Sequence, residues 1–193
     1  MAPEPEPTPL LPRPLLAVAV GLPALLAAGV AAVGLFLGTG GQDEPADPTS
    51  ARSGPVALVP VPAPKAEGEE CQALQSKLPM QLVSNGATLP RRELAAPAPP
   101  GAVAWGDTRH DPIVLRCGLD RPAALTPGST LRVVSDVQWL EITEGTTATW
   151  YVVDRPAYIA LTIPSDAGTG PLQDISTTVR DTLPTTPVDT RGN

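Results

Sequence analysis

The hydrophobic and polar positions of this chain change their period along the sequence. Residues 15–37 form an apolar run without a charged or amide side chain. A helical period follows in "GEECQALQSKLP", where Cys71, Leu74 and Leu78 recur on one face. From Ala102 onward the period falls to two, which is typical of half-buried strands. The order predicts a membrane-length helix, a short amphipathic helix and then a sheet.

The region of period two predicts a meander of antiparallel strands. In "AYIALTIP", Ile159, Leu161 and Ile163 fall on one face. The other strands are expected at "AVAW", "PIVLRC", "LRVV", "VQWLEIT" and "TTATWYVV", with turns at Glu144-Gly145 and Asp154-Arg155-Pro156. The alternation favours a sheet with one buried face.

A second amphipathic helix is expected in "GPLQDISTTVRDTLP". Leu172, Ile175 and Val179 form one stripe there, and Pro184 lies beyond the end. Two helices over one face of a sheet make an economical layered arrangement. The sequence therefore predicts an α+β domain at residues 55–184, with an antiparallel β-meander of about 5–6 strands covered by two helices.

Two stretches of this domain lack a clear period. Residues 80–100 are interrupted by Asn85-Gly86, Pro90 and "APAPP", which predicts a loop. Residues 55–64, "PVALVPVPAP", combine the valines of an edge strand with the prolines of polyproline II. We expect an edge strand there.

The apolar run at residues 15–37 is long enough to cross a membrane. A bilayer core of ~30 Å needs about 20 helical residues, whereas the apolar part of a cleavable signal peptide has about 7–15. An uncleaved transmembrane helix is therefore favoured over a removed signal peptide. Proline, glycine and acidic residues around it predict a disordered cytoplasmic tail at 1–14, a flexible linker at 38–54 and a disordered C-terminal tail at 185–193.

Charge narrows the set of partners. The formal net charge is −7, and Arg91-Arg92 is the only pair of adjacent basic residues. Nucleic acid is not an expected partner, since binding to phosphates needs clustered Lys and Arg, and we interpret the pair as part of a solvated loop. The membrane is an expected partner through the span, where the spacing of Gly34 and Gly38 would also permit a homodimer.

The chain has two cysteines, Cys71 and Cys117. Cys71 lies on the buried stripe of the first helix, and Cys117 shares the apolar face of a strand with Ile113 and Leu115. A bond between them would close a loop of about 47 residues, which stabilises a fold by roughly 4 kcal/mol. We expect this disulfide rather than two free thiols. It indicates an oxidising compartment, with the domain extracytoplasmic and the N-terminus cytoplasmic.

The stretch "WGDTRHDPIVLRCG" contains the only histidine of the chain. A zinc site would have to combine His110 with Asp107 and Asp111, but aspartates beside an Asp-Pro turn are typically capping residues. We therefore expect a structural loop that precedes a strand.

No catalytic set, cofactor or metal is predicted elsewhere. A serine hydrolase would also need the single histidine, and the chain has no G-x-S-x-G turn. Glu141 and Glu144 could serve as an acid–base pair, but they flank a turn and are expected on the solvated rim.

Four aromatic residues are candidates for a binding surface: Trp139, Trp150, Tyr151 and Tyr158. Burial in the core is the favoured interpretation of the tryptophans. Trp150 and Tyr151 are adjacent in a strand, so they must point to opposite sides of the sheet. An exposed member of this set would offer a surface for a sugar or a protein.

The spacing of several motifs resembles a known family. The motifs are "C-x-x-L-x-x-x-LP" from Cys71, "AWG" from Ala104 and "DPIVLRCG" from Asp111, after one span and a proline-rich linker. Together they resemble an actinobacterial family of membrane-anchored proteins classed as a domain of unknown function, over residues 55–184. The resemblance implies no activity and transfers no functional residue.

These patterns favour a membrane-anchored, single-pass protein of the cell envelope. Its extracytoplasmic domain is expected to be a non-enzymatic binding or assembly module, with another envelope protein or cell-wall glycan as the partner. The alternative is a carboxylate-dependent hydrolase that acts on cell-wall material.

Overall fold

The computed structural model describes residues 52–191. The predicted cytoplasmic tail, the transmembrane helix and most of the linker lie outside the described residues. Within 52–191, no helix has the length and apolar character that a membrane crossing requires. The elements are α3 (Glu69–Lys77), β1 (Gln81–Ser84), β2 (Ala87–Arg92), β3 (Ala102–Trp105), β4 (Ile113–Leu119), β5 (Leu131–Val134), β6 (Val137–Glu144), β7 (Thr147–Val152), β8 (Tyr158–Pro164) and α4 (Gly170–Thr182).

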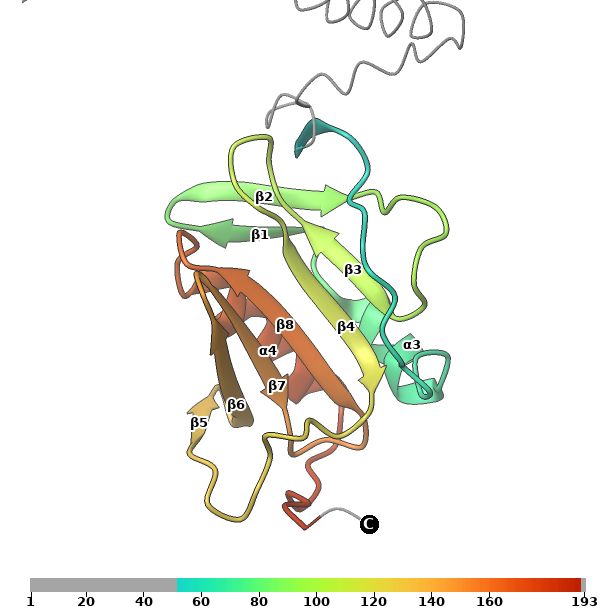
Figure 1. The fold of residues 1–193 in the computed structure, drawn as a ribbon, viewed down its shortest axis with the longest axis vertical. Helices are drawn as coiled ribbons and strands as arrows, with labels where there is room; N and C mark the ends of the chain where they lie inside the picture. Colours follow the sequence, from blue (N-terminus) through green and yellow to red (C-terminus); the bar gives the residue numbers. More distant parts are fainter. Residues whose placement is uncertain (1–51, 192–193) are drawn as a thin grey trace, which may run out of the picture. The chain divides into compact units, whose positions relative to one another are not determined.

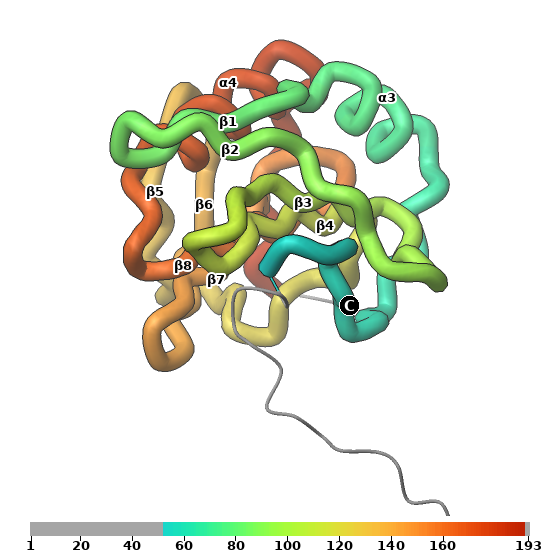
Figure 2. The backbone as a smooth tube through the Cα atoms, turned by 90° about the horizontal axis from the view of Figure 1, so that it is seen from above, coloured from blue at the N-terminus to red at the C-terminus, as the bar shows by residue number. Residues whose placement is uncertain are grey.

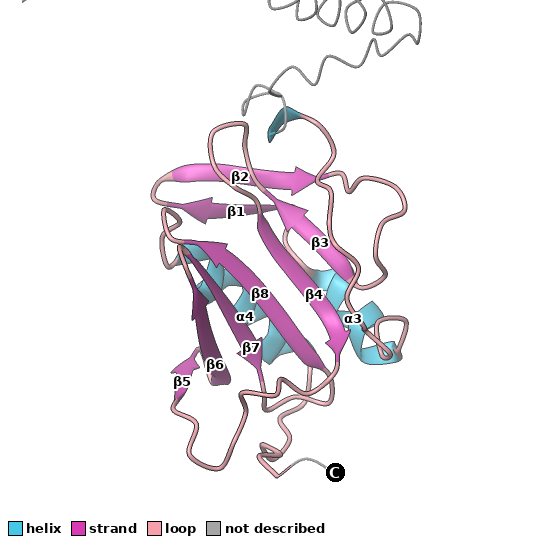
Figure 3. Cartoon of the chain, viewed as in Figure 1, coloured by secondary structure: helices cyan, strands magenta, loops and turns pink. Residues whose placement is uncertain are grey.

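The strands form one antiparallel sheet of eight strands in the order β1-β2-β3-β4-β8-β7-β6-β5. The sheet curls into a half-barrel, as Figures 1 and 2 show. Both helices lie on the same face of the sheet (Figure 3). The α+β class and the two covering helices are confirmed, while the sheet has more strands than the 5–6 that we predicted.

The additional strands are β1 and β2, in the region where we predicted a loop. Residues 81–84 pair with residues 87–90 across a tight turn. Asn85 has φ 48° and Gly86 has φ 79°, left-handed conformations that Asn and Gly adopt readily in such hairpins. The loop prediction was wrong because Asn85-Gly86 is the turn of a hairpin. Pro90 does not end β2, whose last residues, Arg91 and Arg92, pair with β3.

The main core lies between the helices and the face of the sheet that they cover. Helix α3 contributes Cys71 and Leu74, and α4 contributes Leu172, Ile175 and Val179. These residues meet the apolar faces that the period predicted on β4 and β8: Ile113, Leu115, Cys117, Ile159, Leu161 and Ile163. The predicted orientation of both strands is confirmed.

The opposite face of the sheet is also partly covered. Leu125, Leu140 and Val153 form a second buried cluster, against which Val188 packs from the segment after α4. Arg121 donates hydrogen bonds to the main-chain carbonyls of Asp189 and Thr190, at 2.9 and 2.8 Å. The folded domain therefore extends beyond the boundary that we predicted at residue 184.

Residues 55–64 do not form the expected edge strand. Val56 makes a single bridge to Leu94, and the segment then continues without ladder pairing. Pro60, Pro62 and Pro64 lack the N–H groups that a ladder needs, which explains the difference.

The predicted disulfide joins α3 to β4. Cys71 and Cys117 are bonded with an S–S distance of 2.02 Å and a Cα–Cα distance of 5.7 Å. Both residues have an exposed fraction of 0%. The bond therefore fastens the first helix to the centre of the sheet from inside the core.

Candidate functional site

The loop before β4 is organised around Asp107. Its Oδ1 accepts hydrogen bonds from the main-chain N–H groups of Arg109 and His110, each at 2.9 Å. The Nδ1 atom of His110 lies 3.0 Å from both carboxylate oxygens of Asp107. Desolvation acts to raise the pKa of Asp107, but these hydrogen bonds and the nearby imidazole outweigh it and lower the pKa to about 2. Asp107 thus has the capping role that we predicted.

The three residues of the hypothetical zinc site have different surroundings. Asp111 forms an ion pair with Arg52 at 3.2 Å, while Asp107 holds its own loop and His110. Across residues 52–191, no three His, Cys, Asp or Glu side chains are grouped so that they could hold a metal ion.

Arg91 and Arg92 do not belong to a solvated loop, and that interpretation was wrong. Both are partly buried on β2. Arg91 donates to the carbonyl oxygens of Pro79 and Leu78 at 3.1 and 2.9 Å, and its guanidinium lies 5.8 Å from the ring centroid of Trp105. Carbonyls at the C-terminal end of a helix lack intrahelical partners, so Arg91 supplies the missing donors after α3.

Trp139 is not on the surface, although we had considered it as a surface aromatic. It is fully buried, and its indole Nε1–H donates to the Oγ of Ser176 at 2.9 Å. The Ser176 hydroxyl in turn donates to the carbonyl oxygen of Leu172 at 2.6 Å. This chain of hydrogen bonds satisfies the indole inside the core, so Trp139 has a structural role.

The other three aromatic candidates are partly exposed. Tyr151 and Tyr158 pack against the second cluster, and burial raises the pKa of both phenols. Trp150 packs against the main core on the helix-covered face. Trp150 and Tyr151 therefore point to opposite sides of the sheet, as predicted.

Trp150 lines a hollow between the β6–β7 end of the sheet and the start of α4. We call it the Trp150 hollow, and its volume is about 260 Å³. Glu141 lies directly opposite Trp150 in the β6–β7 ladder. Its Oε2 accepts a hydrogen bond from Arg132 at 2.9 Å, which leaves Oε1 for another donor. Five residues with hydroxyl groups also line it, Thr143, Thr146, Thr147, Ser165 and Thr169, and the rest of the lining is glycine or apolar.

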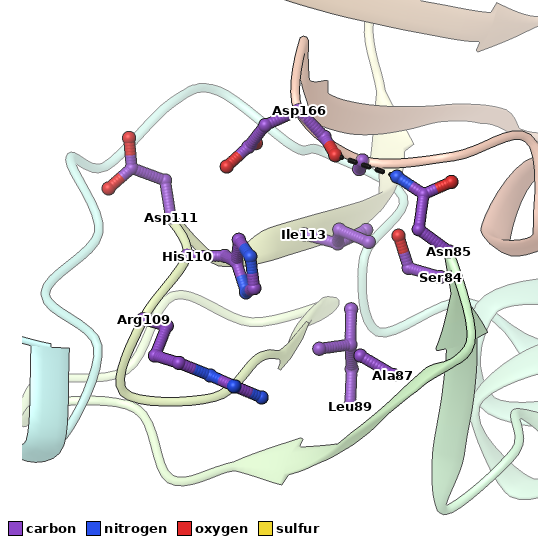
Figure 4. A pocket seen from close by; sticks show the side chains of 10 residues that line it. Ser84, Asn85, Ala87, Leu89, Arg109, His110, Asp111, Ile113 and Asp166 are labelled. Carbon is purple, nitrogen blue, oxygen red and sulfur yellow. Dashed lines mark hydrogen bonds between the residues drawn. The ribbon is translucent and has the colours of Figure 1, made fainter.

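A second hollow, of about 180 Å³, lies beside it. We call it the Asp166 hollow (Figure 4). Ala87, Leu89 and Ile113 supply its apolar surface, and Ser84, Asn85, Arg109, His110, Asp111 and Asp166 supply its polar groups. Asn85 Nδ2 donates to the carbonyl oxygen of Asp166 at 3.0 Å, which fixes the loop that follows β8.

The two hollows share a wall. Ala167 lines both of them, while Asp166 lines the second hollow and Thr169 the first. Reasoning from the sequence identified Trp150 and Glu141 separately but missed Asp166, because nothing in "SDAGTG" marks a site. The β6–β7 ladder brings Glu141 beside Trp150, and the packing of the β8–α4 loop against the β1–β2 turn places Asp166 at the second hollow.

The candidate acid–base pair is not brought together over either hollow. Glu141 lines the Trp150 hollow, whereas Glu144 is exposed at the end of β6 and lines neither.

A comparison with protein families places most of the chain in one family. A family model described as "Protein of unknown function (DUF3515)" matches residues 20–188. No curated protein and no solved structure matches the chain.

Proposed function

The chain belongs to the DUF3515 family, a family of unknown function, and we propose that it is a membrane-anchored binding module of the cell envelope. In this proposal the Trp150 hollow is the binding site, and the ligand is a cell-wall glycan. The module binds its ligand without chemical conversion.

The composition of the Trp150 hollow is the observation that carries the proposal. The C–H face of a sugar ring is apolar and packs well on an indole, while its hydroxyls need hydrogen-bond partners at the edge. Trp150 offers a partly exposed indole, and Glu141 and Thr143 offer oxygen atoms beside it. The hollow has about the size of one sugar ring at a volume of about 260 Å³, slightly below the range of ~300–1,000 Å³ for drug-sized ligands.

Two features support the envelope location. The apolar run at residues 15–37 has the length of a transmembrane helix. The buried Cys71–Cys117 bond favours an oxidising compartment, because disulfides persist outside the cytosol. Together they favour a cytoplasmic N-terminus and an extracytoplasmic domain.

The hydrolase alternative lacks a supporting observation of its own. Glycosidases typically use two carboxylates that flank the scissile bond, about 5–9.5 Å apart. Glu141 is the one carboxylate among the residues that line the Trp150 hollow, and Arg132 already binds it. A binding role needs only the single acceptor that remains.

The experiment uses the full-length protein in detergent micelles. Binding of a short oligosaccharide of N-acetylglucosamine is measured by calorimetry, and the mixture is then assayed for new reducing ends. We expect binding without cleavage, and a loss of affinity of about tenfold in Trp150→Ala. Thr143→Val removes one hydroxyl at the same hollow and should also weaken binding.

Tyr151→Phe is the matched control, because Tyr151 is the neighbouring aromatic residue on the opposite face of the sheet. It should bind like the unaltered protein. Equal affinity in Trp150→Ala and Tyr151→Phe would overturn the proposed site, and release of reducing ends would establish the hydrolase instead. Recovery of the chain in the membrane fraction after a carbonate wash tests the anchor, and a soluble form trimmed near residue 37 would contradict it.

A further inference from the structure

The Asp166 hollow presents groups of both charges over an apolar floor. The side chain of Arg109 is 75% exposed and lies on one side of the hollow. Its Nε and one terminal nitrogen lie 3.4 Å from Asp107 Oδ2, which leaves the N–H groups of the other terminal nitrogen for a ligand. Asp166 lies on another side (Figure 4). Among the described residues, no side chain forms an ion pair with Asp166, whereas Asp111 is already paired with Arg52. A ligand with a carboxylate and an ammonium group would match Arg109 and Asp166.

Size and lining restrict the ligand further. The volume of about 180 Å³ lies well below the range of ~300–1,000 Å³ for drug-sized ligands, so the hollow accommodates about one amino-acid residue. None of its ten lining residues is Trp, Tyr or Phe, so it lacks the large aromatic surface that Trp150 offers in the first hollow. Leu89 and Ile113 provide contact for a short aliphatic side chain instead.

The wall between the two hollows is held in place by the β1–β2 turn. Gly168 N–H donates to Ser84 Oγ at 3.0 Å, and Asn85 Nδ2 donates to the carbonyl oxygen of Asp166 at the same distance. A Cβ atom at Gly168 would clash with Asn85 Oδ1, so the loop packs as closely as glycine allows. Because the wall is fixed, a ligand group in one hollow has a defined distance to the other.

We propose that the Asp166 hollow is a second subsite, which binds a charged amino-acid substituent of the glycan held at Trp150. The ligand of the whole surface is then a sugar that carries a short peptide with a free carboxylate and a free ammonium group. This inference rests on the proposed function, because the Trp150 hollow supplies the sugar subsite. Arg109 binds the carboxylate and Asp166 binds the ammonium group.

The test compares three probes on the full-length protein in micelles by calorimetry. N-acetylmuramyl-lysine has the sugar, the carboxylate and the ammonium group. N-acetylmuramyl-norleucine lacks only the ammonium group, and N-acetylglucosamine lacks the substituent. We expect the lysine conjugate to bind about tenfold more tightly than the norleucine conjugate, since one charge-assisted hydrogen bond separates them.

Variants assign the effect to the two residues. Asp166→Asn should remove the preference for the lysine conjugate over the norleucine conjugate. Arg109→Gln should weaken the binding of both conjugates but not the binding of N-acetylglucosamine. Asp174→Asn is the matched control, because Asp174 is an exposed acid on α4 outside both hollows. It should bind all three probes normally.

The outcomes separate this inference from the proposed function. Equal binding of the two conjugates, or a lysine preference that persists in Asp166→Asn, overturns the second subsite. If N-acetylglucosamine still binds in a manner that depends on Trp150, the proposed function stands. Nα-acetyl-lysine, which lacks the sugar, is a further control. If it binds as tightly as the lysine conjugate, the sugar contributes nothing to binding, and both the proposed function and the glycan subsite are overturned.

Discussion

Replacement of Cys71 and Cys117 by alanine should remove a large part of the stability of the domain. The two residues are 46 positions apart, and a loop of this length restricts the unfolded chain by about 4 kcal/mol in the chain-entropy model. Domains have a net stability of about 5–15 kcal/mol. We therefore expect Cys71→Ala/Cys117→Ala to unfold at a much lower concentration of urea than the unaltered chain.

The position of the bond adds two further expectations. Both cysteines are fully buried between α3 and β4, so alanine leaves unfilled space where the sulfur atoms packed, at a cost of about 1 kcal/mol or more. A reductant in native buffer can reach the bond only when the core opens. Reduction of the folded protein should therefore be slow and should accelerate as urea approaches the unfolding midpoint.

Tryptophan fluorescence is a suitable assay, because the chain has three tryptophans and all of them lie in the described domain. Urea unfolding is followed for the oxidised protein, the reduced protein and the double variant. The reduced protein should lose less stability than the double variant, because it keeps both sulfur atoms in the core. A loss below about 1 kcal/mol in the double variant, or two alkylatable thiols in the native unreduced protein, would contradict the assigned role of the disulfide.

Three further predictions concern single side chains. Ser176→Ala should destabilise the domain by about 1–3 kcal/mol, because the buried indole N–H of Trp139 loses its acceptor. Thr177→Ala, at the neighbouring position, is the control in the same urea assay. Equal losses of stability in the two variants would contradict the assigned hydrogen bond. The pKa of Asp107 is lowered to about 2 in the folded state. The contribution of its carboxylate to the free energy of unfolding is therefore complete above pH ~4 and is lost as the pH falls through about 2. Above pH ~4, Asp107→Asn should be less stable than the unaltered chain by about 1–2 kcal/mol after allowance for screening by water. This difference in stability should shrink as the pH falls from ~4 to ~2. A constant difference over this range would contradict the assigned role of Asp107. Arg91→Met should lower the free energy of unfolding by about 1–3 kcal/mol, because the carbonyls after α3 lose their donors. Arg132→Met removes an exposed ion pair and should change the urea midpoint little. A larger loss of stability in Arg132→Met than in Arg91→Met would disprove the capping role of Arg91.

The aromatic residues show which features of the candidate site can be predicted from the sequence period. Alternation along β7 sufficed to place Trp150 and Tyr151 on opposite faces. It could not say which face would be open, because both faces of this sheet are partly covered. Trp139 became a core residue because α4 places Ser176 beside its indole, a contact between residues 37 positions apart.

The β1–β2 hairpin was hidden for a related reason. Its strands are short, and Pro90 lies within β2, so no regular period appears. The pair Asn85-Gly86 was a sufficient turn signal, but it was outweighed by the surrounding prolines. In the sequence, Arg91 and Arg92 have the pattern of a solvated basic pair. The role of Arg91 depends on the carbonyl groups at the end of α3, which need hydrogen-bond donors.

The elements that depend on local spacing follow from the order of residues along the chain. These are the two amphipathic helices, the apolar faces of β4 and β8, and the pairing of two cysteines on buried stripes. Contacts between distant segments produce the curl of the sheet, the coverage of its second face and the two adjoining hollows. Periodicity relates residues that are only a few positions apart, so it can predict a helix or a strand and its buried face. The wall shared by the hollows depends instead on contacts between the β1–β2 turn and the β8–α4 loop. One of these is the hydrogen bond between Asn85 and Asp166, which are 81 positions apart.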